Sequence, residues 1–278
     1  MGFAATQNCS AGKKLAKIDR CVLTWPVFLC LLAGMKETID ELSVGGLRLI
    51  QAAKGYRFSL DPILLARFVD VRNGDTVVDL GTGSGVIPLL LAKLSGAREL
   101  IGVELQPQLA ERAQRNVELN DLQQRVKIVP GDLRHVRELL PDSSADFVVS
   151  NPPYRPLGSG RISPGKERAA ARHELAGGLN DFVAGAGWLL KNGGRFALIY
   201  LAERLPELMY QMVTAGIEPK RLRMIHPRYG DTARMVLVEG KKSARPGLIV
   251  EKPLYIYRGE GRDYSEEVLS MYEGRSDD

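Results

Sequence analysis

The chain has 278 residues, of which 45% are hydrophobic and 26% are charged, which is typical of a globular protein long enough for one large α/β domain. Its net charge of +5 and isoelectric point of about 9.1 permit an anionic partner without establishing one. All three cysteines precede Met35, which excludes a disulfide framework, a cysteine metal site and a cysteine nucleophile from the remainder. Metal binding is not expected, because the three histidines (His135, His173 and His226) lie far apart in the sequence.

The first 34 residues differ from the rest of the chain. Three lysines precede a short apolar run over residues 21–33, which resembles a secretory signal and is shorter than a typical bilayer-spanning helix. Cleavage after Ala33 would place Leu31 where a small residue is needed. We therefore expect residues 1–34 to be a leader or an upstream extension, with a natural start at Met35 in a cytoplasmic protein. A membrane-tethered form is the alternative.

Residues 35–72 are expected to form a hairpin and a helix that pack on the core. Alternating side chains predict strands over 47–51 and 56–60 around a turn at 54–55. Asp61 and Pro62 then open a helix, since proline is favoured at the first helical position. The segment either simply covers the sheet or also brings Phe58 or Asp61 to a cofactor.

A glycine-rich turn follows the first strand of the core. The apolar run Thr76–Leu80 leads into Gly81, Gly83 and Gly85, and a helix is predicted over Val86–Leu94. The spacing is G-x-G-x-G, and no Gly-Lys-Ser/Thr follows, so a phosphate-binding P-loop is excluded. Asp79 stands just before the glycines, where a carboxylate would repel a pyrophosphate. It suits a cationic ligand, such as the amino group of S-adenosylmethionine.

Two further strands each end in an acidic residue. The strand over 99–103 ends at Glu104, which follows Gly83 by 21 residues and can accept hydrogen bonds from ribose hydroxyls. An amphipathic helix over 107–120 leads to a strand over 126–129 and then to Asp132 and Leu133. We expect Asp132 to bind an adenine amino group while Leu133 packs on the ring.

The strand over 146–150 runs directly into Asn151, Pro152, Pro153 and Tyr154. The two prolines stiffen this segment and leave its carbonyl groups for a ligand. The Asn151 side-chain oxygen and the Pro152 carbonyl can together accept both hydrogens of a planar amino group, and Tyr154 can stack on the ring that bears it. Such positioning, without a strong general base, would aim the nitrogen lone pair at a methyl donor.

Strand and helix patterns alternate along the chain, which predicts a doubly wound α/β fold with a mostly parallel, Rossmann-like sheet. The later elements are helices over 179–190 and 204–215, a strand over 195–201, and strands over 221–226 and 233–239 that form an antiparallel hairpin at the C-terminal side. We expect the methyltransferase-like core to span 73–257 and a tail to span 258–278.

The sequence from Asp79 to Gly85, taken with Asn151–Tyr154, resembles class I S-adenosylmethionine-dependent amino methyltransferases. The flanking segments 55–61, 158–162, 170–174, 253–257 and 264–268 resemble those of the bacterial tRNA1(Val) (adenine(37)-N6)-methyltransferase family. The resemblance implies N6-methylation of adenine-37 in valine tRNA, with no metal and no obligate protein partner. It places Asp79, Gly81, Gly83, Gly85, Glu104 and Asp132 at the cofactor and Asn151–Tyr154 at the base.

Basic residues near the Asn-Pro-Pro-Tyr motif support an RNA partner. A basic loop beside a base pocket is what phosphate contacts require, although a loop of this composition can simply be solvated. The candidate RNA-binding residues are Arg155, Arg161, Lys166, Arg168, Arg172 and Arg228.

Three other functions fit parts of this pattern. A glutamine methyltransferase acting on release factors would use the same pocket geometry, but residues 35–72 are too few for a separate recognition domain. A DNA adenine-N6 methyltransferase would carry the same tetrapeptide. A non-catalytic scaffold that binds S-adenosylmethionine or RNA would be expected to have lost Asn151–Tyr154, which is intact.

Overall fold

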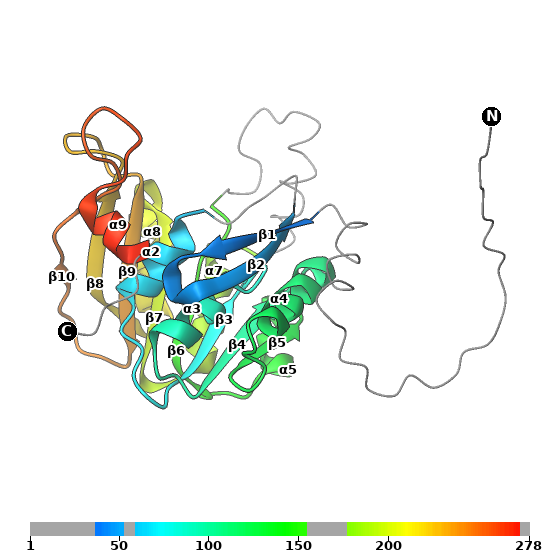
Figure 1. The fold of residues 1–278 in the computed structure, drawn as a ribbon. Coiled ribbons are helices and arrows are strands. Elements are labelled where there is room, and N and C mark those ends of the chain that lie inside the picture. The colour runs from blue at the N-terminus through cyan, green and yellow to red at the C-terminus, as the bar shows by residue number, and fades with distance from the viewer. Residues whose placement is uncertain (1–36, 53–58, 155–176, 273–278) are drawn as a thin grey trace, which may run out of the picture. The chain divides into compact units, whose positions relative to one another are not determined.

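Figure 1 shows the fold in a computed structural model, which describes residues 37–52, 59–154 and 177–272. These residues all belong to a unit that begins at Glu37. None of the helices in the three ranges combines the length and the apolar character that crossing a bilayer requires.

A central sheet carries the fold, and nine strands of the described residues belong to it. The strand order is β10-β8-β9-β7-β6-β3-β4-β5, with β11 also paired to β8. The five strands from β7 to β5 are parallel, whereas β9 runs antiparallel to both β7 and β8. The strands are β3 (Thr76–Leu80), β4 (Glu99–Glu104), β5 (Val126–Pro130), β6 (Ala145–Ser150), β7 (Leu190–Leu201), β8 (Ile217–His226), β9 (Met235–Lys242), β10 (Ile249–Val250) and β11 (Leu254–Tyr255).

Helices cover both faces of this sheet and enclose one hydrophobic cluster on each (Figure 1). One face packs against α2 (Asp61–Phe68), α3 (Val86–Leu94), α4 (Pro107–Leu119) and α9 (Glu266–Tyr272). The other packs against α5 (Val136–Leu139), α7 (Leu179–Leu189) and α8 (Leu205–Thr214). Since side chains alternate across a strand, Val77 of β3 joins the first cluster and Val78 joins the second. The central strands are therefore apolar on both faces, as parallel strands covered by helices should be.

The expected doubly wound sheet, mostly parallel and closed by an antiparallel hairpin, is confirmed. The predicted core strands and helices agree with the observed ones within a few residues. The strand expected over 195–201 begins earlier, at Leu190, and β7 accommodates the added residues through a shift of register against β6 between Ala145 and Phe147. The β8 strand begins at Ile217, before the predicted start at residue 221.

The N-terminal hairpin has a different partner from the one predicted. The β2 strand (Leu47–Ala52) pairs antiparallel with β1 (Glu37–Leu42), through the short helix η1 (Val44–Gly46). The prediction paired residues 47–51 with 56–60, but Ser59 and Leu60 are not in a strand, and residues 53–58 lie outside the described ranges. The upstream partner was missed because Glu37–Leu42 shows no clear alternation of apolar and polar residues.

The C-terminal residues return to the first hydrophobic face. Val268 of α9 is fully buried there, and Met271 and Tyr272 pack against the same cluster. Arg67 of α2 also donates a hydrogen bond to the Met271 carbonyl. The chain up to Tyr272 thus contributes to the core.

Candidate active site

The glycine turn and the Asn-Pro-Pro-Tyr segment begin side by side at one edge of the sheet. The strands β3 and β6 are parallel neighbours, and Leu80 pairs with Ser150 at their carboxyl ends. The Ser150 hydroxyl donates a hydrogen bond to the Leu80 carbonyl over 2.8 Å and is fully buried. Asn151 therefore leaves the sheet next to Gly81. We call this side, formed by the carboxyl ends of β3, β4 and β6, the catalytic edge.

The glycine turn needs its glycines for backbone conformation. Gly81, Gly83 and Gly85 have φ angles of +74°, +60° and +82°, a region that side-chain-bearing residues rarely adopt. A side chain at Gly85 would also press against Ala113 of α4, at 3.2 Å. At Gly83, by contrast, no atom lies within 4 Å of where a β-carbon would stand. A side chain at Gly81 would likewise press against the Phe182 ring, at 3.0 Å, so the turn is tight against the protein at Gly81 and Gly85 and open at Gly83, as a ligand cradle requires.

Asp79 is the least satisfied polar group of the site. Its side chain is 2% exposed, and within the described residues neither carboxylate oxygen has a hydrogen-bond partner. Burial raises the pKa of Asp79 to about 7, and repulsion from Glu104 adds to this effect. The Thr82 hydroxyl lies near enough to oppose the rise, although it does not reach hydrogen-bond geometry. A buried carboxylate without partners is strongly destabilising unless a cation or a donor joins it.

Glu104 is held by backbone amides. Its Oε2 accepts from the amide of Gly83 and its Oε1 from the amide of Gln106, each over 2.8 Å. Burial raises the pKa of Glu104, and these hydrogen bonds oppose the rise. Glu104 therefore fixes the glycine turn at Gly83 from the neighbouring strand, and each of its oxygens keeps a second lone pair for a hydroxyl donor.

Asp132 forms an ion pair near the surface, whereas Leu133 is buried in the core. The Asp132 carboxylate accepts from the backbone amide of Arg134 over 2.9 Å and forms an ion pair with its guanidinium, which lowers the pKa of Asp132. To bind an adenine amino group, the Asp132 carboxylate would therefore have to accept a further hydrogen bond beside those from Arg134, or lose its ion pair with the Arg134 guanidinium. Leu133 is 5% exposed and belongs to the second hydrophobic cluster, so little of it remains for stacking on a ring.

The side chains of Asn151 and Tyr154 meet at the catalytic edge. The Tyr154 hydroxyl lies 2.6 Å from Asn151 Oδ1 and 2.9 Å from Asp61 Oδ2. Ser59 also donates to the same Asp61 oxygen, over 2.8 Å. The Tyr154 ring packs edge-on against Tyr200 of β7, with the ring centroids 6.1 Å apart. Since a phenol carries one hydrogen, Tyr154 can donate to only one of its two acceptors at a time.

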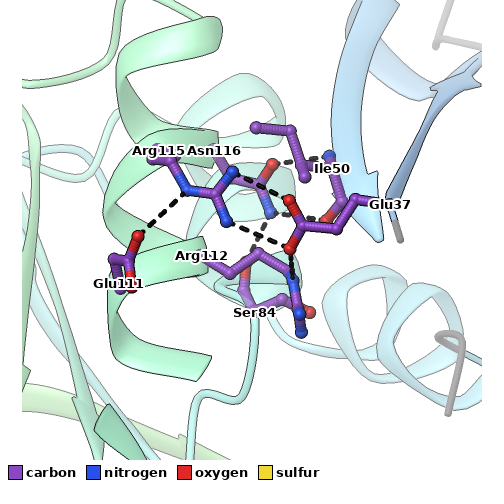
Figure 2. Close-up of polar contacts among 7 residues, drawn as sticks. All are labelled: Glu37, Ile50, Ser84, Glu111, Arg112, Arg115 and Asn116. Carbon is purple, nitrogen blue, oxygen red and sulfur yellow. Dashed lines mark hydrogen bonds and ion pairs between the residues drawn. The ribbon is translucent and has the colours of Figure 1, made fainter. Parts of the chain in front are cut away.

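Asn116 of α4 links the glycine turn to the N-terminal hairpin (Figure 2). Its side-chain nitrogen donates to the Ser84 carbonyl over 2.9 Å and to the Ile50 carbonyl over 3.3 Å, and its oxygen accepts from the Ile50 amide over 2.7 Å. One turn later, Asn120 makes the same pair of contacts with the backbone of Arg48. The two asparagines therefore pair with β2 along its edge.

A buried ion-pair cluster fixes the other strand of this hairpin. Glu37 of β1 accepts hydrogen bonds from Arg112 over 2.8 Å and from Arg115 over 2.9 Å, both on α4 (Figure 2). These interactions lower the pKa of Glu37 against the opposing effect of its burial. The hairpin is thus attached to the helix that contacts the glycine turn.

Of the six candidate RNA-binding residues, Arg228 alone lies in the ranges that the structure describes. Arg155, Arg161, Lys166, Arg168 and Arg172 lie outside the described residues. Arg228 lies in the loop between β8 and β9, where its guanidinium donates to the carbonyls of Gly259 and Gly261 over 3.0 and 2.8 Å. It also lies over the Tyr257 ring, 5.2 Å from its centroid. In this arrangement Arg228 joins two loops of the protein.

Two residues of the site were not predicted in the roles the structure gives them. Asp61 was considered only as a neighbour of a cofactor, whereas its carboxylate contacts Tyr154. Asn116 was not singled out, although a polar residue between Ala113 and Val117 on the apolar face of a helix is a signal of a buried hydrogen-bonded group.

Comparisons with known proteins agree on the class of protein. Residues 65–157 match the family model of the TRM5/TYW2 methyltransferase domain. The chain is 28% identical to the tRNA1(Val) (adenine(37)-N6)-methyltransferase of Phocaeicola vulgatus, over 76% of this chain and 86% of that protein. It is 33% identical to the protein of the same name from Porphyromonas gingivalis, over 56% of this chain and 66% of that protein.

Solved structures agree on the fold. A predicted O-methyltransferase from Agrobacterium tumefaciens superposes with a TM-score of 0.62 and 24% identity, over 78% of this chain and 99% of that one. TYW2 of M. jannaschii, in complex with AdoMet, superposes with a TM-score of 0.51 and 19% identity, over 74% and 86% of the two chains. At such identities the likeness supports the Rossmann-like methyltransferase fold alone.

Proposed function

We propose that this chain is a member of the methyltransferase family whose bacterial members are named tRNA1(Val) (adenine(37)-N6)-methyltransferase, and that it transfers a methyl group from S-adenosylmethionine to N6 of an adenine in tRNA. The names of these relatives favour adenine-37 of valine tRNA as the target.

One observation carries this proposal. Leu80 and Ser150 are paired neighbours, so the glycine turn of β3 and the Asn-Pro-Pro-Tyr segment of β6 start at adjacent points of the catalytic edge. A methyl donor held by the first would therefore lie beside an amino group held by the second. This proximity is the main requirement of a direct transfer between two bound molecules.

The residues of the glycine turn fit S-adenosylmethionine. The two carboxylate oxygens of Asp79, which have no hydrogen-bond partner in the described part of the chain, suit the cationic amino group of its methionine part. The open space over Gly83 admits the ligand close to the backbone, and Glu104 next to it keeps lone pairs for the ribose hydroxyls. When bound, S-adenosylmethionine would supply an electrophilic methyl group: the N–C bond would form as the S–C bond breaks, S-adenosylhomocysteine would leave, and the methylated nitrogen would then release one proton to water.

Asn151 and Pro152 would hold the adenine amino group. The Asn151 side-chain oxygen and the Pro152 carbonyl each accept one of its hydrogens, which keeps electron density on N6 and fixes its direction. The Tyr154 ring stacks on the base. No group in this scheme must remove a proton before the transfer, because the nitrogen lone pair is the nucleophile.

Asp61 would leave the side-chain oxygen of Asn151 available to the adenine amino group. In the structure, the Tyr154 hydroxyl is 2.6 Å from Asn151 Oδ1, the atom that must accept a hydrogen from the base. Asp61 Oδ2 is a second acceptor only 2.9 Å from the same hydroxyl. When the amino group arrives, Tyr154 can donate to Asp61 instead, and its ring stays positioned. Asp61 thus acts through Tyr154 as a positioning residue.

Transfer of labelled methyl tests the function. The protein is incubated with labelled S-adenosylmethionine and, in parallel, unmodified valine tRNA, a release factor and duplex DNA. We expect label in the tRNA alone, recovered as N6-methyladenosine after digestion. Label in the release factor or the DNA would keep the chemistry and overturn the substrate. No label in any of them, with S-adenosylmethionine still bound, would indicate a scaffold.

Two variants separate catalysis from folding. Asn151→Ala should lose at least about a hundredfold in turnover, because it removes an acceptor at the reacting nitrogen, while its affinity for S-adenosylmethionine stays unchanged. Asn180→Ala, which changes an exposed asparagine of α7, is the matched control and should remain fully active. An Asn151→Ala protein with normal turnover would show that the motif does not hold the amino group.

A further inference from the structure

The loop between β8 and β9 lies at the catalytic edge. The β9 strand pairs antiparallel with β7, so its first residue, Met235, stands opposite Leu201 at the carboxyl end of β7. Ile225, near the end of β8, pairs with the same Met235. Because β7 runs parallel to β6, the loop over residues 227–234 leaves the sheet on the same side as Asn151.

This loop presents an aromatic surface to solvent. Tyr229 is 87% exposed, the highest value among the exposed large hydrophobic residues in the part of the chain that the structure describes. Its ring centroid lies 5.7 Å from that of Tyr255, and the Tyr255 centroid lies 5.5 Å from that of His226. We call these three residues the stacking surface. Most of the Tyr229 ring remains open, because its contact with Tyr255 is tilted, at 59° between the ring planes.

The loop that carries Tyr229 is held in place from both sides. His226 Nδ1 lies 2.7 Å from the Asp231 carbonyl, across the loop. Arg228, next to Tyr229, is bound to the carbonyls of Gly259 and Gly261, and in Figure 1 these two loops lie together beyond β8 and α9. Tyr255 is paired to His226 through β11. An exposed aromatic ring on a fixed loop is preorganised for binding, because little conformational entropy remains to be lost.

We propose that the stacking surface binds an unpaired nucleobase of the RNA substrate, with Tyr229 stacking on the base and Tyr255 supporting it. The inference rests on the proposed function and adds a second contact site for the same RNA. Three strand spacings separate β6 from β8, about 14 Å in all, so a few nucleotides of single-stranded RNA can reach from Asn151 to Tyr229.

The charges around the surface favour stacking over phosphate binding. The exposed arginines Arg234, Arg258 and Arg262 are nearly balanced by the exposed acids Asp231, Glu260 and Asp263. Aromatic platforms bind single strands because an unpaired base offers its face, whereas a duplex hides the faces of its bases. Single-stranded RNA, rather than a duplex, is therefore the partner that this surface fits.

Direct binding of RNA, measured without turnover, tests the proposal. The full chain is titrated with the anticodon stem-loop of valine tRNA and with an RNA duplex. Tyr229→Ala should weaken binding of the stem-loop about tenfold or more, while Tyr229→Trp retains it. The slope of affinity against salt concentration should not change, because no phosphate contact is lost. Tyr210→Ala, which removes a tyrosine of α8 that is 72% exposed, is the matched control.

Fluorescence provides an independent readout of stacking. The indole of Tyr229→Trp should be quenched by the stem-loop, and that of Tyr210→Trp should not. Unchanged stem-loop affinity in Tyr229→Ala would overturn the proposal, as would equal losses in Tyr229→Ala and Tyr210→Ala. If the protein binds RNA through Tyr229 but methylates a release factor, only the proposed function fails. If it methylates tRNA and Tyr229→Ala binds normally, only this inference fails.

Discussion

Replacement of Asp79 by asparagine should stabilise the ligand-free protein and weaken cofactor binding. This carboxyl group is buried and has no hydrogen-bond partner among the residues that the structure describes, and burial raises its pKa from 3.8 to about 7. Between these two pH values the folded protein keeps the proton and the unfolded chain releases it. The stability of the wild-type protein therefore falls as pH rises through this range, and the neutral Asp79→Asn variant lacks that loss.

The size of the effect follows from the pKa shift. At about 1.36 kcal/mol per unit, a rise from 3.8 to about 7 corresponds to about 4 kcal/mol at pH 8. At pH 5, where the folded protein still holds the proton, the same group costs less than half as much. The stability advantage of Asp79→Asn over the wild-type protein should therefore grow by about 3 kcal/mol from pH 5 to pH 8.

Urea denaturation of the ligand-free proteins at the two pH values measures this difference. Asp142→Asn, which changes an exposed carboxylate, is the control and should show no comparable trend. Isothermal titration at pH 8 should show Asp79→Asn binding S-adenosylmethionine about tenfold or more weakly, since a charged contact is lost. A stability difference that stays constant between pH 5 and pH 8 would refute the argument from burial.

Two further predictions concern residues that position the site. Asp61→Asn should lower kcat about tenfold without changing cofactor affinity, because Tyr154 loses its charged acceptor. In a Tyr154→Phe background the same change should have no further effect, and additive losses in this double-mutant cycle would contradict the coupling. Asn116→Ala should lower the free energy of unfolding by at least about 2 kcal/mol in urea, since three hydrogen bonds to buried backbone disappear. Gln114→Ala, exposed on the same helix, should cost little, and equal losses in the two variants would show that the asparagine pairing contributes nothing special.

Most of the core fold could be predicted because its signals are local. The strand over Thr76–Leu80 and the helix over Val86–Leu94 were predicted with the bounds that the structure has. Each is a mostly apolar run followed by a residue that ends it, and the alternation of such strands and helices leaves few possible arrangements of the sheet. The hairpin differs, since the second edge of β2 is bound by asparagines 66 and 72 residues further along the chain, a contact that no local pattern indicates.

The same distinction holds for the candidate site. Residues of a short motif could be predicted: Gly81 of the glycine turn and Asn151 of the Asn-Pro-Pro-Tyr segment each follow the end of a strand. The two strands are neighbours in the sheet, which brings the two motifs together. The contact between Tyr154 and Asp61 joins residues 93 positions apart, and no local pattern indicates it. The ion pair of Asp132 with Arg134 is a local contact, because the two residues are only two positions apart, and it could have been predicted from the sequence.

The pairing of Asn116 and Asn120 with β2 has a consequence for solubility. A hairpin of two strands presents a row of unpaired backbone groups along each outer edge, and such an edge is a template for strand addition by another molecule. Along β2, the two amide side chains occupy both the N–H and the C=O of Arg48 and Ile50, as a third strand would. The helix α4 thereby covers this edge against strand addition, and loss of both asparagines would expose the unpaired backbone groups of β2 as a site for aggregation.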